Sequence, residues 1–175
     1  MLALLGSFIV ELAVMKDLSK LASSELLALH AEIGEALRER GVVRSSNNPA
    51  GDLAEYLFCK AFGWKQAPKS EKGYDARAAD SARYQIKGRR PTKHNKSRQL
   101  GILRDLDKAG FEHLAGVVFC EDYRVHRAAI VPHALVLSNS TFSEHSRGWI
   151  FHLKDHVWDW DGVLDVTERL QSIRF

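Results

Sequence analysis

The segment GYDARAADSARYQIKGR, residues 73–89, decides the fold of this chain. Residues 74–77 and 82–87 have the composition of two short strands, and turn-forming residues at 79–81 separate them. Two strands joined by so short a turn predict a β-hairpin.

Alternation along the second strand separates its polar and apolar side chains. Residues two apart on a strand face the same side, so Gln85 and Lys87 are expected to point together. Tyr84 and Ile86 are expected to point to the opposite, apolar side. If the two strands pair, Asp75 on the first strand lies beside Gln85 and Lys87.

Apolar residues recur at helical spacing upstream of the hairpin. Residues 18–40 predict one helix that stops at Gly41, and residues 49–62 predict a second helix that ends at Gly63. Glu55 belongs to the second helix. If this helix packs on the sheet, Glu55 can reach the polar residues of the hairpin.

Helices and strands are also predicted downstream of the hairpin. Residues 100–110 predict a helix with leucines on one face, and residues 115–120 and 127–131 predict apolar strands. Three shorter elements follow, a helix at 132–137, a strand at 149–153 and a final helix at 165–173. This order predicts an α/β fold, with a central mixed β-sheet flanked by helices.

Length and composition bound the architecture. The chain has 175 residues, 45% of them hydrophobic and 27% charged, which fits a folded protein and argues against disorder. We expect an extra N-terminal helical appendage, residues 1–45, and one domain, residues 46–175. Cys59 and Cys120 form no disulfide framework and no repeated zinc-binding pattern, and they fit buried thiols in a reducing cytoplasm.

The first 15 residues, MLALLGSFIVELAVM, are apolar. The stretch is too short to span a bilayer, Glu11 interrupts it, and it lacks the cationic opening of a secretory signal. We therefore expect a core helix or a helix that forms a homodimer, and no membrane anchor. An upstream mis-start is the alternative.

Positive charge is concentrated in one part of the chain. The formal net charge is +3, yet residues 83–98 contain seven Lys or Arg residues and no Asp or Glu. The rest of the chain has 18 basic and 22 acidic residues. Charge concentrated in this way favours a polyanionic partner, nucleic acid first. A solvated basic loop is the alternative.

The polar residues around the hairpin suit a magnesium site. Mg²⁺ prefers oxygen ligands and retains several waters. Asp75 would be the strongest ligand, Gln85 would supply a carbonyl oxygen, and Glu55 would hold a metal-bound water. Lys87 would orient and help deprotonate an attacking water or offset charge on a phosphate. Each of these residues alone is more typical of an ordinary surface, so the prediction depends on their combination.

Three motifs together resemble the core of the PD-(D/E)XK, or restriction-endonuclease-like, nuclease superfamily. They are GDLAEY at 51–56, GYD at 73–75 and YQIKGR at 84–89. The resemblance implies a restriction-endonuclease-like core and Mg²⁺-dependent (or Mn²⁺-dependent) phosphodiester hydrolysis.

Carried across by position, Asp75 matches the motif aspartate, Gln85 the Asp/Glu position and Lys87 the motif lysine. Glu55 matches an acidic residue of the first core helix. The chain departs from the pattern in two ways, because Tyr74 replaces proline and Gln85 replaces a carboxylate. The second departure removes one ligand charge from the metal site.

These observations predict a cytoplasmic, Mg²⁺-dependent DNA endonuclease, with RNA as an open alternative substrate. The nucleic-acid-binding residues would be Arg89, Arg90, Lys93, His94, Lys96 and Arg98, although His94 is equally typical of a solvated loop. One rival is a catalytically inactive nucleic-acid-binding module of the same fold. Another is an assembly protein whose apolar N-terminus drives dimerisation.

Two other motifs are weaker indications of function. His152 and His156 are four residues apart, but their surroundings predict a strand and turn instead of a zinc-binding helix. Trp158 and Trp160 could stack on a base, although packing over a hydrophobic edge is more common. The phosphate-binding glycine loops and the GxSxG nucleophile motif are absent from the sequence.

Overall fold

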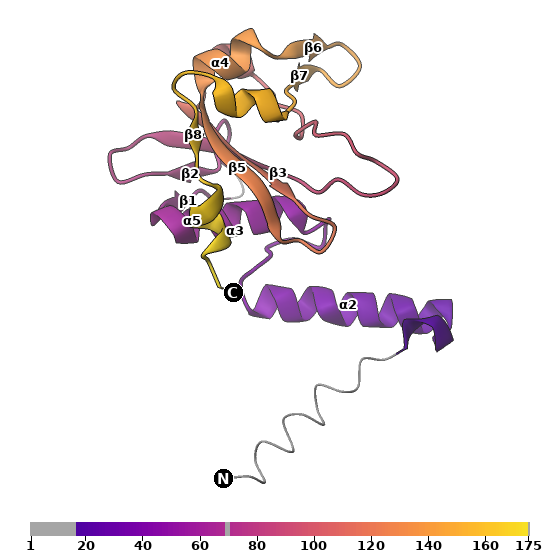
Figure 1. Cartoon of the computed structure of the whole chain (residues 1–175). Coiled ribbons are helices and arrows are strands. Elements are labelled where there is room, and N and C mark those ends of the chain that lie inside the picture. Colours follow the sequence, from indigo (N-terminus) through magenta and orange to yellow (C-terminus); the bar gives the residue numbers. More distant parts are fainter. Residues whose placement is uncertain (1–16, 69–70, 175) are drawn as a thin grey trace. The chain divides into compact units, whose positions relative to one another are not determined.

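The computed structural model describes residues 17–68 and 71–174, and the chain divides into two units, residues 1–40 and 41–175 (Figure 1). The helix expected within residues 1–15, with its role in a core or a dimer, lies outside the described residues.

The first unit contains a short 3-10 helix, η1 (Leu18–Lys20), and the α-helix α2 (Ser23–Glu39). The Asp17 carboxylate caps η1 by accepting a hydrogen bond of 3.2 Å from the Ser19 amide. Glu25 closes the start of α2, because its carboxylate accepts from the Ala22 amide at 2.8 Å. The predicted helix is therefore present but interrupted. None of the described helices is long and apolar enough to cross a membrane.

The second unit is built on a six-stranded mixed sheet. Its strands, in spatial order, are β1 (Lys65–Gln66), β2 (Ala76–Arg77), β3 (Arg83–Arg89), β4 (His113–Phe119), β5 (Val125–Pro132) and β8 (Leu164–Asp165). The β3–β4 pair is parallel, whereas the other neighbouring strands of this sheet run antiparallel. The predicted class, α/β around a mixed sheet, is confirmed. A separate hairpin joins β6 (Thr141–Ser143) to β7 (Gly148–Ile150).

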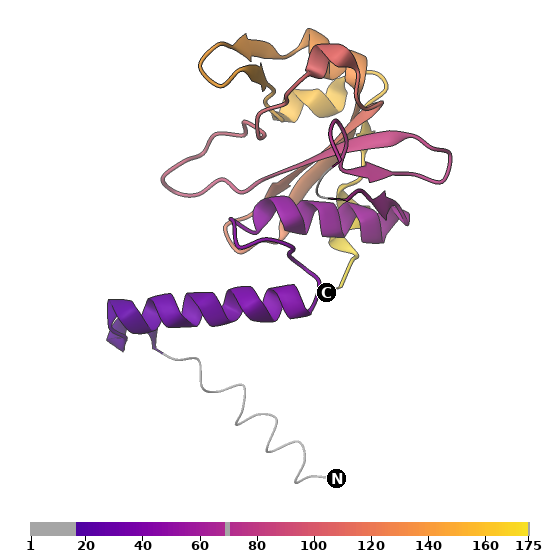
Figure 2. The same cartoon turned by 180° about the vertical axis from the view of Figure 1, so that it is seen from behind.

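The helices α3 (Ala50–Phe62) and α5 (Thr167–Gln171) lie on one side of this sheet (Figures 1 and 2). A close approach at Gly88 lets α3 pack against β3. A Cβ atom at this position would lie 2.4 Å from the Ala50 carbonyl oxygen, so no side chain fits without movement. Gly63 ends α3 in the left-handed conformation, with φ of 68°. The predicted helix at 49–62 is confirmed.

The helix α4 (His133–Ser138) and the 3-10 helix η3 (Asp155–Asp159) belong to the other side of the sheet. A second apolar core forms there. Its buried members are Leu100, Leu103, Leu106, Phe111, Leu114, Val118, Ala129, Val131, Val136, Phe151, Leu153 and Val157. Strand β4 is therefore apolar along almost its whole length, because both of its faces are buried.

The predicted helix at 100–110 is wrong. The segment consists mostly of bends and turns, with bridges that join Gln99 to His152 and Leu103 to Trp149, and only the short η2 (Leu106–Lys108) is helical. Its leucines are buried as expected. The backbone of this segment, however, hydrogen-bonds to residues 149–153 and not within a helix. Leucines three residues apart are therefore buried here without helical backbone conformation.

The other predicted elements are present with shifted ends. The hairpin forms from β2 and β3, and Ser81 at its turn has φ of 73°. Strands β4 and β5 and helix α4 match the predictions. The final helix is shorter than predicted, and the Asp165 carboxylate at its start accepts from the Thr167 amide at 2.9 Å. Only residues 149 and 150 of the strand predicted at 149–153 lie in β7.

Candidate functional site

Asp75 is held in place by backbone hydrogen bonds on both sides. Its amide donates to the Tyr84 carbonyl at 2.8 Å, and its carbonyl accepts from the Ala67 amide at 2.8 Å. Asp75 therefore sits immediately before β2, between β3 and the residue that follows β1. These two hydrogen bonds hold the Asp75 backbone beside β3, so its side chain lies next to this strand.

The Asp75 carboxylate joins the polar residues of β3. Its Oδ2 atom accepts hydrogen bonds from the Gln85 side-chain amide and, at 2.7 Å, from the Ile86 backbone amide. The same oxygen lies 3.6 Å from Lys87 Nζ. The structure thus brings Gln85, Ile86 and Lys87 to one oxygen of the Asp75 carboxylate.

Strand alternation accounts for this grouping. Ile86 is buried, whereas Gln85 and Lys87 flank it and are partly exposed. Tyr84, on the same side as Ile86, stacks on Trp64 with 3.7 Å between ring centroids. The Lys87 side chain is 24% exposed, so its ammonium group is accessible from solvent while its partner holds it in place.

Glu55 lies on α3, which packs on the side of the sheet that Gly88 faces, whereas Gln85 and Lys87 point to the opposite side of β3. The Oε2 atom of Glu55 accepts from the Gln66 side chain at 2.8 Å and forms an ion pair with Arg44. Burial, followed by the negative charge of Asp75, raises the pKa of Glu55, while Gln66 and Arg44 lower it. The repulsion from Asp75 places these two carboxylates within electrostatic reach of each other.

Sequence reasoning missed Arg44 and Gln66. Asp52, in the first turn of α3, anchors the loop that carries Arg44, because its Oδ2 atom accepts from the backbone amides of Arg44 and Ser45 at 2.8 and 2.7 Å. Gln66 lies on β1, next to β2. A serine- and asparagine-rich loop gives no sequence signal that one of its residues will reach a carboxylate on the next helix.

Cys59 lies one helical turn after Glu55. Burial, followed by the charge of Glu55, raises the pKa of its thiol to about 11. The thiol is therefore protonated at neutral pH and is a poor nucleophile. Cys59 and Cys120 are both free and half-buried.

Among the described residues, no group of three His, Cys, Asp or Glu side chains is placed to hold a metal ion. The oxygen donors available here are the carboxylates of Asp75 and Glu55 and the side-chain amide of Gln85. Mg²⁺ is commonly held by one or two carboxylates together with substrate phosphates and retained waters, so Asp75, Glu55 and the Gln85 carbonyl oxygen fit it.

The predicted nucleic-acid-binding arginines have partners within the chain. Arg89 Nε donates to the Ser97 carbonyl at 2.9 Å. Arg90 donates to the Glu121 carbonyl at 2.9 Å and lies over the Tyr123 ring, 4.6 Å from its centroid. Both arginines therefore stabilise the loop after β3 through contacts within the chain.

The remaining predicted residues lie on and after a tight turn. Thr92 and Asn95 pair across it, which exposes Lys93, His94 and Lys96. Arg98 forms an ion pair with Asp155, and its Nη2 atom lies 3.5 Å from His126 Nε2. The lysines are thus presented to solvent, whereas Arg98 is oriented by an acidic neighbour.

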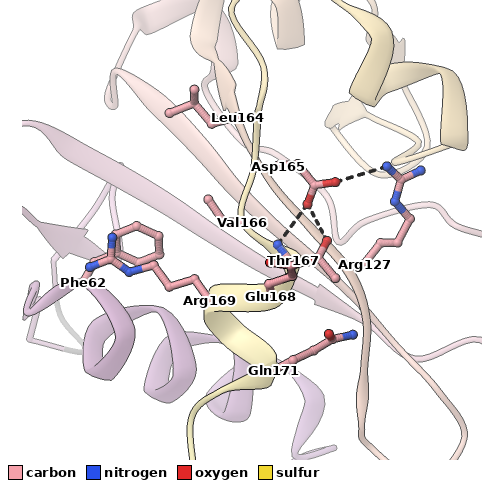
Figure 3. Close-up of a pocket in the computed structure, with 9 residues that line it drawn as sticks. All are labelled: Phe62, Arg127, Leu164, Asp165, Val166, Thr167, Glu168, Arg169 and Gln171. Carbon is pink, nitrogen blue, oxygen red and sulfur yellow. Dashed lines mark hydrogen bonds and ion pairs between the residues drawn. The ribbon is translucent and has the colours of Figure 1, made fainter.

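A separate hollow beside α5 is unrelated to these residues. Figure 3 shows Asp165 between Arg127 and Thr167, with Phe62 and Arg169 on the opposite wall. Arg127 Nη2 lies 3.3 Å from Asp165 Oδ2. These pairs connect β5 to the start of α5, so the hollow is explained by how the C-terminal helix is attached.

The histidine and tryptophan motifs have structural roles. His152 lies in an extended bridge and His156 in η3, so they do not share a helical face. Trp158 Nε1 donates to the Ala128 carbonyl at 3.2 Å, and Arg127 covers its ring. The packing alternative for this tryptophan is the one observed.

Comparison with models of known protein families and with curated proteins found no match for this chain.

Proposed function

We propose that this protein is a Mg²⁺-dependent nuclease with a restriction-endonuclease-like core, and that it hydrolyses phosphodiester bonds in DNA. The observation that carries the proposal is that the Gln85 side-chain amide and Lys87 Nζ both meet one oxygen of the Asp75 carboxylate, whose charge also acts on Glu55. Glu55 comes from α3, Asp75 comes from the residue immediately before β2, and Gln85 and Lys87 come from β3.

The architecture supports the same proposal. The resemblance implies a mixed sheet whose hairpin carries the acid and the lysine, with a helix on one face that supplies a further acid. The chain has these parts in this order, in α3, β2 and β3, followed by the parallel partner β4. The resemblance also implies a helix between the hairpin and the next strand, and this part of the chain holds only the short η2 there, so the support comes from α3, the hairpin and β4.

Each residue has a chemical role in this proposal. Bound Mg²⁺ would supply positive charge at the scissile phosphate. Asp75 and Glu55 provide the negative charge that holds the cation, and Gln85 adds a neutral oxygen after rotation of its amide. Lys87 can orient a water for attack and offset charge on the phosphate, because Asp75 already fixes its ammonium group nearby.

A binding module without catalysis is the second candidate, and two observations favour it. Gln85 supplies one charge fewer than a carboxylate at that position. Arg44 and Gln66 also donate to Glu55, so protein donors satisfy the carboxylate that a cation would otherwise use. In this candidate the cationic residues bind nucleic acid, but no bond is cleaved.

A cleavage assay tests the proposal and separates the two candidates. Plasmid, single-stranded DNA and RNA are each incubated with the purified protein and Mg²⁺ or Mn²⁺, and parallel reactions contain EDTA. The nuclease proposal predicts metal-dependent cleavage of a DNA substrate. Binding without cleavage under every condition would support the inactive module, and cleavage that persists in EDTA would contradict the metal-dependent mechanism.

A further inference from the structure

Two neighbouring hollows on the second unit share Lys96 and Arg98. One is lined further by His152 and by residues 154–156, and the other by the turn at 91–93 and the facing ends of β4 and β5. We infer that the two hollows form one groove for a nucleic-acid strand. We name it the cationic groove and define it by Lys93, Lys96, Arg98, His152, Lys154 and His156. The inference rests on the proposed function and extends it to residues 152–156.

Backbone hydrogen bonds build this groove. The Leu100 amide donates to the Phe151 carbonyl at 3.0 Å, and the Leu153 amide donates to the Arg98 carbonyl at 3.1 Å. The two segments therefore run side by side. Phe151 and Leu153 point into the core, so the alternating residues His152 and Lys154 are exposed beside the segment that carries Arg98.

The groove begins next to the candidate site. Arg89 and Lys87 point to the same side of β3, because they are two residues apart. Arg89 Nε donates to the carbonyl of Ser97, which lines the first hollow. The Lys87 side chain passes Gly101, where an added Cβ atom would lie 3.5 Å from Lys87 Cδ. A strand held in the groove would therefore continue toward Lys87.

The charges in the groove favour a phosphodiester backbone as the occupant. Lys93, Lys96 and Lys154 are exposed, and no ion pair ties their ammonium groups to an acid within the described residues. Two acids line the hollows: Glu121, whose carboxylate accepts from the Lys93 backbone amide, and Asp155. Arg98 pairs with it and Arg127 lies 3.6 Å from it, so its charge is compensated. The lysines can then act as point charges toward phosphates.

The test measures binding of a fluorescein-labelled DNA duplex by anisotropy in EDTA, over a range of NaCl concentrations. The variant is Lys154→Ala. The matched control is Lys108→Ala, because Lys108 is exposed on η2, lies outside both hollows and carries the same charge. Loss of one phosphate contact weakens binding about five- to tenfold at ~0.1 M salt and lowers the salt slope by about 0.9.

We expect this loss for Lys154→Ala and wild-type binding for Lys108→Ala. Equal binding by the two variants would overturn the groove, while binding by the wild type with cleavage in Mg²⁺ would leave the proposed nuclease function intact. Absence of binding by the wild-type protein would overturn both proposals. A circular dichroism melt of each variant checks that any loss does not come from unfolding.

Discussion

Lys87 Nζ lies 3.6 Å from Asp75 Oδ2, although the two residues belong to different parts of a hairpin. The contact requires that Asp75 be pinned before β2 and that Lys87 occupy the side of β3 opposite the buried Ile86. Both conditions follow from strand pairing and alternation. The candidate site is therefore a consequence of the hairpin that organises the sheet, and its chemistry can be tested residue by residue.

Removal of either partner of this pair should abolish cleavage. We expect Asp75→Asn and Lys87→Ala to lower the cleavage rate by a factor on the order of 10² or more, while DNA binding is largely retained. Asparagine can still accept the Ile86 amide hydrogen bond, so the fold should persist.

The measurement is the initial rate of plasmid cleavage in Mg²⁺. Asp80→Asn, at the exposed hairpin turn, is the control and should cleave at the wild-type rate. Unchanged cleavage by Asp75→Asn would reject this site.

The Glu55→Gln variant should gain stability relative to the wild type as the pH rises, and it should lose cleavage activity. Because the native pKa of Glu55 is raised above its ordinary value of 4.5, the folded state binds this proton more tightly than the unfolded state. The contribution of Glu55 to stability therefore falls as the pH rises from about that value through the raised native pKa. Glutamine removes this fall, so the free energy of unfolding of the variant, relative to the wild type, should be larger at pH ~7 than at pH ~4.

Urea unfolding in EDTA at several pH values measures this difference, and cleavage assays on the same samples should show reduced activity. Glu144→Gln, an exposed residue between β6 and β7, provides the control. A stability difference that is independent of pH would show that Glu55 is not destabilised in its charged form.

Gln85→Glu should strengthen metal binding. The substitution places a second carboxylate against Asp75 and restores the charge that the motif position commonly carries. We expect Mn²⁺ affinity to rise on the order of tenfold, and the protein to be less stable without metal, because two adjacent carboxylates repel. Isothermal titration calorimetry with Mn²⁺ measures the affinity. The same gain should be absent when Asp75→Asn is combined with Gln85→Glu, and an unchanged affinity in the single variant would argue against a shared metal position.

Gly88→Ala should destabilise the second unit. The added Cβ atom would meet the Ala50 carbonyl oxygen at 2.4 Å and the Ala54 Cβ at 3.0 Å, so α3 must move away from β3. Overpacking of this kind costs about 1–3 kcal/mol. Gly51→Ala, on α3 with no atom within 4 Å of the added Cβ, should instead stabilise by ~0.5–1 kcal/mol. Chemical unfolding measures the free energy of unfolding of both variants. Equal values for the two variants would contradict the close packing of α3 on β3 at Gly88.

Local patterns in the sequence predicted the elements that carry the site. Proline and glycine mark the two ends of α3, and alternation on β3 predicts that Gln85 and Lys87 point together. These features depend on backbone conformation near each residue, which the sequence encodes directly. The hairpin and the apolar strands β4 and β5 follow from equally local patterns.

The misses arose where distant segments decide the structure. The leucines of 100–110 have helical spacing, but their backbone pairs with residues 149–153, which no local pattern reveals. The same pairing creates the cationic groove. Arg44 reaches Glu55 only because Asp52 folds the preceding loop back onto α3. Contacts of this kind depend on tertiary packing, which overrides local preference.

The most direct test of a metal site at Asp75 is anomalous diffraction from crystals of the protein soaked in Mn²⁺. We predict an anomalous peak roughly 2.1 Å from a carboxylate oxygen of Asp75, with Gln85 or Glu55 in its coordination shell, and loss of the peak in Asp75→Asn crystals. A well-ordered Asp75 with no peak beside it, in crystals that bind Mn²⁺ elsewhere, would contradict the account.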